Sequence, residues 1–168
     1  MEFKKIQLNG FKSFAEKTNF LIEDGLTGIV GPNGCGKSNI VESLRWCMGE
    51  TSAKSMRGSG MEDVIFSGTS NKPSKNIAEV SISLSNENKD GPFQYKELDE
   101  IQIRRKIEKD KGSKFYINDK EVRAKDAQMF FADLSTGAHS PSIISQGRIG
   151  SLVTAKPQDR RAILEEAA

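Results

Sequence analysis

A glycine-rich octapeptide constrains the fold of this chain more than any other feature. Residues 31–38 read GPNGCGKS and match the pattern GxxxxGK[ST]. The apolar run at 26–30 precedes them and predicts a strand buried on both faces. Apolar residues recur at helical spacing over 40–48, and Gly49 follows at the expected helix end. Because this motif requires a strand before it and a helix after it, the segment predicts a phosphate-binding loop.

The residue types in this loop account for phosphate binding. Its three glycines lack a Cβ, so backbone N–H groups can converge on a phosphate beside the positive end of a helix. Lys37 is expected to reach the β- and γ-phosphates, and the hydroxyl of Ser38 is expected to coordinate Mg²⁺. We interpret Cys35 as a small residue at a variable position rather than as a redox-sensitive thiol.

Composition excludes several classes of protein. The chain has 168 residues, of which 36% are hydrophobic, a content that argues against wholesale disorder. Charge is nearly balanced at +2, so contact with nucleic acid would need a local patch. The candidate patch is the basic stretch at 104–106 with Lys109, Lys111 and Lys114. No apolar run approaches the ~20 residues of a membrane span, and the two cysteines have neither metal nor disulfide spacing. We therefore expect a soluble domain of a reducing cytosol.

The remaining segments predict an α/β domain. Alternation or β-branched residues predict strands at 2–9, 18–23, 64–66, 78–84, 101–107 and 114–117, with a tight turn at Asn118 and Asp119. Helical spacing predicts helices over 124–134 and from Pro157 onward. The last helix stops at Ala168 without a cap, which suggests that the chain is cut there.

A phosphate loop alone does not distinguish a kinase, a GTPase, a helicase and an ABC-type ATPase. Hydrolysis needs a carboxylate on a second strand to hold Mg²⁺ and polarise water. Asp133 and Glu165 follow apolar residues, but both lie in helical patterns. Since neither is a convincing candidate, a self-contained kinase or transport ATPase is disfavoured, and a complete hydrolytic site is not encoded in these residues.

Longer stretches resemble one family. They are GFKSF at 10–14, the segment 31–50, the segment 52–68, SIISQGR at 142–148 and KPQDRRAILEEAA at 156–168. In order and register these are similar to the N-terminal half of the ATPase head of bacterial SMC (structural maintenance of chromosomes) proteins. The resemblance implies an ABC-type P-loop fold, α/β with a mixed sheet and an antiparallel part, that is incomplete without a C-terminal lobe. It places the head lobe at 1–156 and the start of a truncated coiled-coil helix at 157–168.

The same resemblance implies site residues. Gln146 matches the glutamine that touches Mg²⁺ and the attacking water, and Arg57 matches an arginine that couples DNA to hydrolysis. With Lys37 these are the expected catalytic residues, and Ser38 and Gln146 are the expected metal contacts. The expected nucleotide contacts are Lys12, Ser13, Pro32, Asn33, Gly34, Cys35, Gly36, Lys37, Ser38 and Asn39. Purely structural roles stay open for three of these positions: Arg57 as a cation after a helix, and Lys12 and Ser13 as an exposed turn.

The implied cofactors are ATP and Mg²⁺, and the implied activity is ATP hydrolysis that drives head engagement and chromosome condensation and segregation. The implied partners are the C-terminal lobe, a second SMC subunit in a homodimer, a kleisin with accessory subunits, and DNA in the cytoplasmic nucleoid. The 168 residues alone are expected to be inactive, because the C-terminal lobe carries the Mg²⁺-binding Asp, the catalytic Glu and the signature serine. Alternatives are a half-head of a double-strand-break repair ATPase and a non-enzymatic fragment. The segment 134–138 (LSTGA) is not taken as an ABC signature, since it lacks the second glycine and precedes Gln146.

Overall fold

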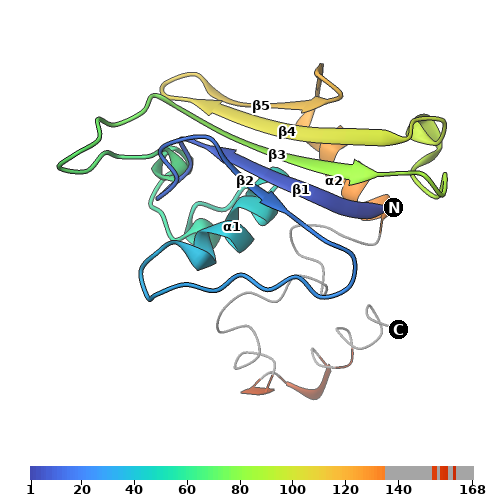
Figure 1. Cartoon of the computed structure of the whole chain (residues 1–168), viewed down its shortest axis with the longest axis horizontal. Helices are drawn as coiled ribbons and strands as arrows, with labels where there is room; N and C mark the ends of the chain where they lie inside the picture. The colour runs from blue at the N-terminus through green and yellow to red at the C-terminus, as the bar shows by residue number, and fades with distance from the viewer. Residues whose placement is uncertain (135–152, 155, 159–160, 162–168) are drawn as a thin grey trace.

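The computed structural model describes residues 1–134, 153–154, 156–158 and 161. At its centre is a six-stranded sheet of order β2-β1-β3-β4-β5-β6, in which all neighbouring strands are antiparallel (Figure 1). The strands are β1 (Glu2–Asn9), β2 (Thr18–Leu21), β3 (Ile77–Ser85), β4 (Glu100–Glu108), β5 (Gly112–Ile117) and β6 (Lys120–Val122). The strands predicted at 2–9, 18–23, 78–84, 101–107 and 114–117 are therefore confirmed, as is the antiparallel part of the fold.

One face of this sheet is apolar and carries both helices. Along β4 every second residue is buried, which is the period of a strand with one covered face. Helix α1 (Lys37–Cys47) packs against β3 and β4, and α2 (Ala124–Asp133) packs against β5. Residues of both helices and of β1, β3, β4 and β5 share one hydrophobic core. The helices predicted over 40–48 and 124–134 are confirmed.

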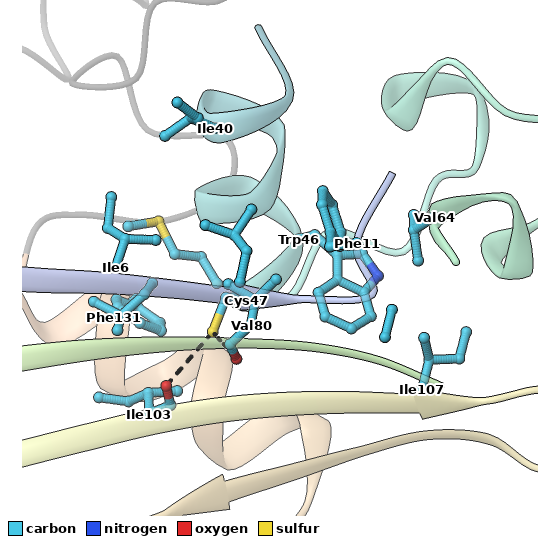
Figure 2. Packing of buried hydrophobic residues seen from close by; sticks show 14 of the residues in the cluster. Ile6, Phe11, Ile40, Trp46, Cys47, Val64, Val80, Ile103, Ile107 and Phe131 are labelled. Atoms are coloured by element: carbon cyan, nitrogen blue, oxygen red, sulfur yellow. Dashed lines mark hydrogen bonds between the residues drawn. The ribbon is translucent and has the colours of Figure 1, made fainter. Parts of the chain in front are cut away.

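The last turn of α1 is fixed to the middle of the sheet. Trp46 is fully buried, and its ring lies 5.4 Å from that of Phe11. The Cys47 thiol lies 3.5 Å from the carbonyl oxygen of Val80 and 3.6 Å from that of Ile103 (Figure 2). Burial raises the pKa of this thiol to about 12. Because the C-terminal end of α1 is anchored in this way, its N-terminal turn and the loop before it are held at a defined place beside the sheet.

The prediction of a strand at 26–30 is wrong. Leu26 is completely exposed and Val30 is 93% exposed, and no strand is formed by these residues. The physical reason is the lack of a partner, since a strand exists only through the hydrogen bonds of a neighbour. The apolar run therefore precedes the glycine-rich loop as an extended, uncovered segment.

The strand predicted at 64–66 is also wrong. Met61–Val64 forms a 3-10 turn, η2, and Ile65 makes only an isolated bridge to Phe11. The amide of Lys12 donates to the carbonyl of Val64 at 2.7 Å, and the amide of Phe66 donates to that of Gly10 at 2.8 Å. These two bonds cross-link the segment to the turn after β1, so its apolar residues are buried without joining a sheet.

Two predicted chain reversals are confirmed. Asn118 and Asp119 have φ of 46° and 62° and connect β5 to β6, as in the two-residue turn whose twist matches paired strands. Gly49 has φ of 106° just after α1, the left-handed conformation common at helix C-termini.

Pro157, Gln158 and Arg161 are helical, but the rest of the predicted final helix lies outside the described residues.

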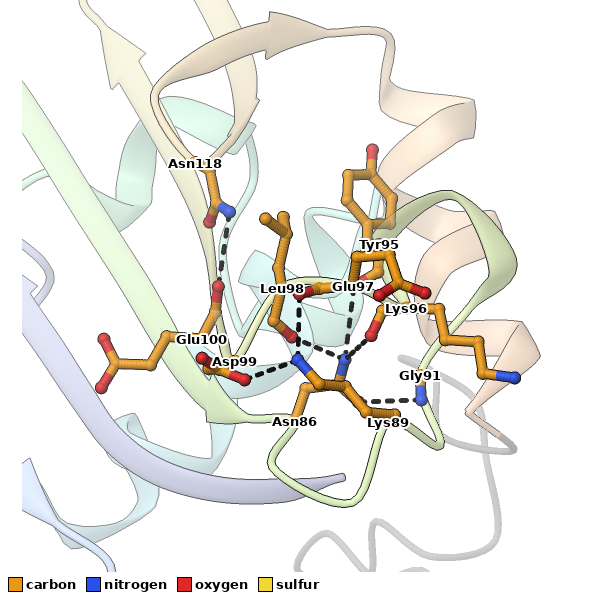
Figure 3. A network of polar contacts seen from close by, with 10 residues as sticks. All are labelled: Asn86, Lys89, Gly91, Tyr95, Lys96, Glu97, Leu98, Asp99, Glu100 and Asn118. Carbon is orange, nitrogen blue, oxygen red and sulfur yellow. Dashed lines mark hydrogen bonds and ion pairs between the residues drawn. The ribbon is translucent and has the colours of Figure 1, made fainter.

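The connection between β3 and β4 is organised around one buried side chain. The amide nitrogen of Asn86 donates to the carbonyls of Leu98 at 2.8 Å, Lys96 at 3.1 Å and Tyr95 at 3.3 Å (Figure 3). Its oxygen accepts the backbone N–H of Gly91 at 2.9 Å. The hydrogen bonds of this one side chain therefore fix the conformation of the loop, which includes the 3-10 turn η3 (Phe93–Tyr95).

Within the described ranges, no helix combines the length and the apolar content needed to cross a bilayer.

Candidate functional site

The glycine-rich loop leads directly into the first turn of α1. Gly36 is the N-cap residue with φ of 95°, and Gly34 has φ of 82°. Both values lie in the left-handed region, where a side chain is strained. A Cβ on Gly36 would also collide with the hydroxyl oxygen of Ser13. The first turn of α1 contains no acidic residue, and the first N–H groups of a helix have no partner inside it. This geometry suits an anion, because free donors and the positive helix end coincide.

The side chain of Lys37 lies over the same loop. Its ammonium group donates to the carbonyl oxygens of Pro32, at 2.6 Å, and of Gly31. The Cys35 sulfur lies 3.9 Å from this ammonium nitrogen. Asn33 and Cys35 are exposed, like the rest of residues 31–35. The cation is therefore held against the carbonyl oxygens of an exposed loop.

A polar cluster lies beside this turn and joins three separate segments. Glu42 of α1 has a side chain only 11% exposed, and its carboxylate contacts both the ammonium of Lys12 and the guanidinium of Arg57. The amide oxygen of Asn39 accepts from Arg57 at 2.9 Å, and its amide nitrogen donates to Ser13 at 2.9 Å. Around the start of α1 the structure thus brings together four residues that the sequence predicted as site residues: Lys12, Ser13, Asn39 and Arg57.

Sequence reasoning missed Glu42. A charged residue between Ile40, Val41 and Leu44 has the pattern of one polar position on an amphipathic helix, which is ordinarily exposed. Only the tertiary structure places two cations from distant segments against it. The one available signal was that Glu42 follows Ser38 by four residues, which puts both on the same side of the helix.

The residues predicted as metal contacts are placed unequally. Ser38 is exposed in the first turn of α1, next to Lys37, and a hydroxyl oxygen is a ligand that Mg²⁺ accepts. Within the described ranges, no group of three His, Cys, Asp or Glu residues could hold a metal ion. Gln146 lies outside the described residues, as do all residues of the segment 134–138 except Leu134. Of the two predicted metal contacts, the described residues therefore contain one oxygen ligand, the hydroxyl of Ser38.

The basic stretch on β4 is not the continuous patch expected from the sequence. Arg105 is only 3% exposed and points into the core, so the prediction fails for this residue. Its guanidinium donates to the carbonyls of Trp46 and Glu50, each at 2.7 Å, and lies over the rings of Trp46 and Phe115. Burial lowers its pKa to about 10. The reason is the period of the strand, which sends alternate side chains to opposite faces.

Among the described residues, three of the five other charges of that stretch form ion pairs. Arg104 contacts Glu79 at 3.2 Å and Asp119 at 2.9 Å. Lys111 pairs with Glu108 at 2.6 Å, and Lys114 pairs with Glu121 at 3.0 Å. Such pairing reduces the positive potential that attracts a phosphate backbone. A patch of this composition is therefore a weak candidate for contact with DNA.

A large cleft lies elsewhere on the molecule. It has a volume of about 1220 Å³ and is bounded by η3, β5, β6 and α2. Its charged groups include two neighbouring ion pairs, Lys114 with Glu121 and Arg123 with Asp126. None of the predicted nucleotide-contacting residues lines it. The phosphate loop is therefore an open, surface site that this cleft does not include.

Comparison with known proteins places these features in a family. A family model described as the RecF/RecN/SMC N-terminal domain matches residues 2–147. The chain belongs to this family. The chromosome partition protein Smc of Cereibacter sphaeroides is 55% identical over 168 residues, which is all of this chain and 15% of that protein. The chain thus spans about 15% of the length of this SMC relative and corresponds to its N-terminal head region.

Solved structures agree with the SMC assignment. A chain from work on ATP-driven dimerization and DNA-stimulated activation of SMC ATPases matches with a TM-score of 0.89 at 32% identity, covering 100% of both chains. The Smc head domain from Pyrococcus furiosus, with an extended coiled coil and bound to the C-terminal domain of ScpA, gives a TM-score of 0.90 at 32% identity. That match covers 98% of this chain and 41% of the other. The fold is that of the N-terminal lobe of an SMC head, as the sequence predicted.

Proposed function

We propose that residues 31–38 bind the triphosphate of ATP and that this chain is the nucleotide-binding part of an SMC ATPase head. The observation that carries the proposal is the loop geometry: two left-handed glycines lead into the N-terminal turn of α1, and the Lys37 ammonium lies against the same loop. When bound, Mg²⁺ would neutralise phosphate charge, and we propose that the hydroxyl of Ser38 would be one of its ligands. Gln146 is proposed to contact Mg²⁺ and the attacking water.

Completion of the site requires residues from elsewhere. The segment 26–30 supports this view, since it leaves Leu26 and Val30 uncovered immediately before the loop. Uncovered apolar residues are stabilised by burial, and we propose that the C-terminal lobe of the same head covers them. We also place on that lobe the carboxylates that hydrolysis needs. The 168 residues alone should therefore turn over almost no ATP.

The partners are proposed from the relatives. ATP-driven dimerization and DNA-stimulated activation are described for SMC ATPases, and ScpA is bound to the head of the Pyrococcus furiosus relative. We infer that two heads of this kind enclose nucleotide between them, that a kleisin binds the head, and that DNA stimulates hydrolysis. The cycle would serve chromosome condensation and segregation in the nucleoid. Similarity to chromosome partition proteins favours this role over that of a double-strand-break repair ATPase.

The test uses this chain co-expressed with the C-terminal lobe of its own full-length protein. Lys37→Ala removes a charge-assisted contact worth about 1.5–3 kcal/mol, so we expect ATP to bind roughly 10- to 100-fold more weakly. Lys17→Ala is the matched control, because Lys17 is also a lysine but is exposed and lies outside residues 31–38 of the sequence. Equal ATP affinity in Lys37→Ala and in the parent, measured by titration calorimetry, would refute the proposal. Rapid hydrolysis by the 168 residues alone would refute the division into two lobes.

A further inference from the structure

The carboxylate of Glu42 is shared between two cations that behave differently. Lys12 has a side chain 13% exposed, and its ammonium contacts both Glu42 and the carbonyl oxygen of Met56. Arg57 has a side chain 56% exposed and contacts the other carboxylate oxygen of Glu42. Lys12 is therefore enclosed by its acceptors, whereas Arg57 remains open to solvent on one side.

The contacts of Arg57 occupy a single edge of its guanidinium group. Its Nε forms the ion pair with Glu42 and its Nη2 donates to Asn39, and these two nitrogens lie on the same side of the planar group. A guanidinium has five N–H donors in a fixed fork, so the opposite edge keeps donors for which the described residues supply no acceptor. Because Asn39 lies in the first turn of α1, Arg57 is held close to the phosphate-binding loop.

The backbone at both cationic residues is in the left-handed region. Lys12 has φ of 48° and Arg57 has φ of 56°, a conformation that costs a residue with a side chain some free energy and persists where its surroundings determine it. An ion pair with an exposed arginine adds little to stability. The geometry of this cluster is therefore better explained by where it holds the arginine than by the stability that it contributes.

We propose that Glu42 is a positioning residue: its carboxylate, fixed by Lys12, holds one edge of Arg57 so that the other edge faces an anionic group of the bound nucleotide. This inference rests on the proposed function of the loop. It adds Glu42 to the proposed site as a residue that does not itself contact the nucleotide. Loss of the carboxylate leaves Lys12 and Arg57 as neighbouring like charges, which repel. Arg57 then loses its fixed direction while the loop itself is unchanged.

The first experiment is a double-mutant cycle on the head assembled from this chain and the C-terminal lobe. We expect Glu42→Gln to lower kcat at least about tenfold while the KM for ATP changes by less than about threefold. In an Arg57→Ala background the same substitution should change kcat by less than about twofold, because the arginine through which it acts is gone. Glu42→Asp keeps a shorter carboxylate and should recover part of kcat. Effects of Glu42→Gln and Arg57→Ala that multiply would overturn the proposal.

Glu50→Gln is the matched structural control. Glu50 is also a buried glutamate in an ion pair, with Arg45 at 2.8 Å, but it lies after the far end of α1. We expect this variant to lower the melting temperature without removing the dependence of kcat on Arg57. Should both glutamine variants reduce kcat equally at equal loss of melting temperature, Glu42 has only a structural role. If Glu42→Gln does not fold, Glu42→Ala, which also removes the carboxylate, replaces it in the cycle.

The second experiment needs no nucleotide. The Nε–H resonance of Arg57 in a ¹H–¹⁵N spectrum should be protected from exchange in the parent and in Glu50→Gln, and should lose that protection in Glu42→Gln. An unchanged resonance would refute the positioning role. Should the assembled parent hydrolyse no ATP, the proposed function fails, and the Arg57 resonance alone then decides whether Glu42 holds the arginine.

Discussion

Replacement of Arg105 by methionine tests how α1 is attached to the sheet. The guanidinium donates to the carbonyls of Trp46 and Glu50 at the end of α1, each at 2.7 Å, and lies 4.5 and 4.6 Å from the ring centroids of Trp46 and Phe115. Methionine has a similar length and is apolar, so it retains packing and leaves both carbonyl oxygens without their donor.

The magnitude follows from those contacts. Two hydrogen bonds from a charged donor are worth about 1.5–3 kcal/mol each, and desolvated cation–π contacts add about 2 kcal/mol. The recovered desolvation of the guanidinium offsets part of this sum. We expect a loss of about 3–5 kcal/mol in unfolding free energy, or roughly 6–20 °C in melting temperature for a chain of this size.

Urea unfolding followed by tryptophan fluorescence measures this loss. Trp46 is the sole tryptophan and is fully buried, so its emission reports on this contact directly. Arg104→Met is the control on the neighbouring position of the same strand, where the side chain faces away from the core and pairs with Glu79 and Asp119. It should cost about 1 kcal/mol or less. A loss below about 1 kcal/mol for Arg105→Met would contradict the attachment of α1 through this residue.

Two further predictions concern the loop and the core. Gly36→Ala places a Cβ in a left-handed residue and against Ser13, so we expect about 1–3 kcal/mol of destabilisation and weaker ATP binding by calorimetry. Gly60→Ala, where the backbone has φ of −136° and open space surrounds the Cβ position, should change neither quantity. Because burial raises the pKa of Cys47 from its ordinary value of 9.0 to about 12, the folded state keeps its thiol proton longer, and stability is lost as pH rises between these values. The unfolding free energy of the parent relative to Cys47→Ala should fall by about 1.4 kcal/mol per pH unit above pH 9, and a constant difference across urea titrations from pH 8 to 10 would be inconsistent with the buried thiol.

Much of the fold was predictable because its information is local. The glycine-rich loop and α1 are contiguous in sequence, so glycine positions and helical spacing were enough to predict that a helix follows the loop. Strands β3, β4 and β5 were equally accessible, since alternate burial repeats every second residue. The tight turn at Asn118 and Asp119 also depends only on the residues within it.

What could not be predicted depends on partners far along the chain. The run at 26–30 indicates a need for burial but not which segment supplies it, and the described residues supply none. The segment 64–66 has the composition of a strand, but backbone hydrogen bonds to the turn after β1 determine its path. Composition reports burial, whereas strand formation requires a neighbour with free hydrogen-bonding groups.

Neighbouring residues were enough to predict a glycine-rich loop followed by a helix, and their resemblance to an SMC head was confirmed. The surroundings of the charged residues, in contrast, depend on the tertiary structure. Arg105 is part of a basic stretch in sequence but lies in the core, and Glu42 looks like a solvated helix position but holds Lys12 and Arg57. The energy of a charge depends on what surrounds it in space, and that environment is assembled from segments that are distant in sequence.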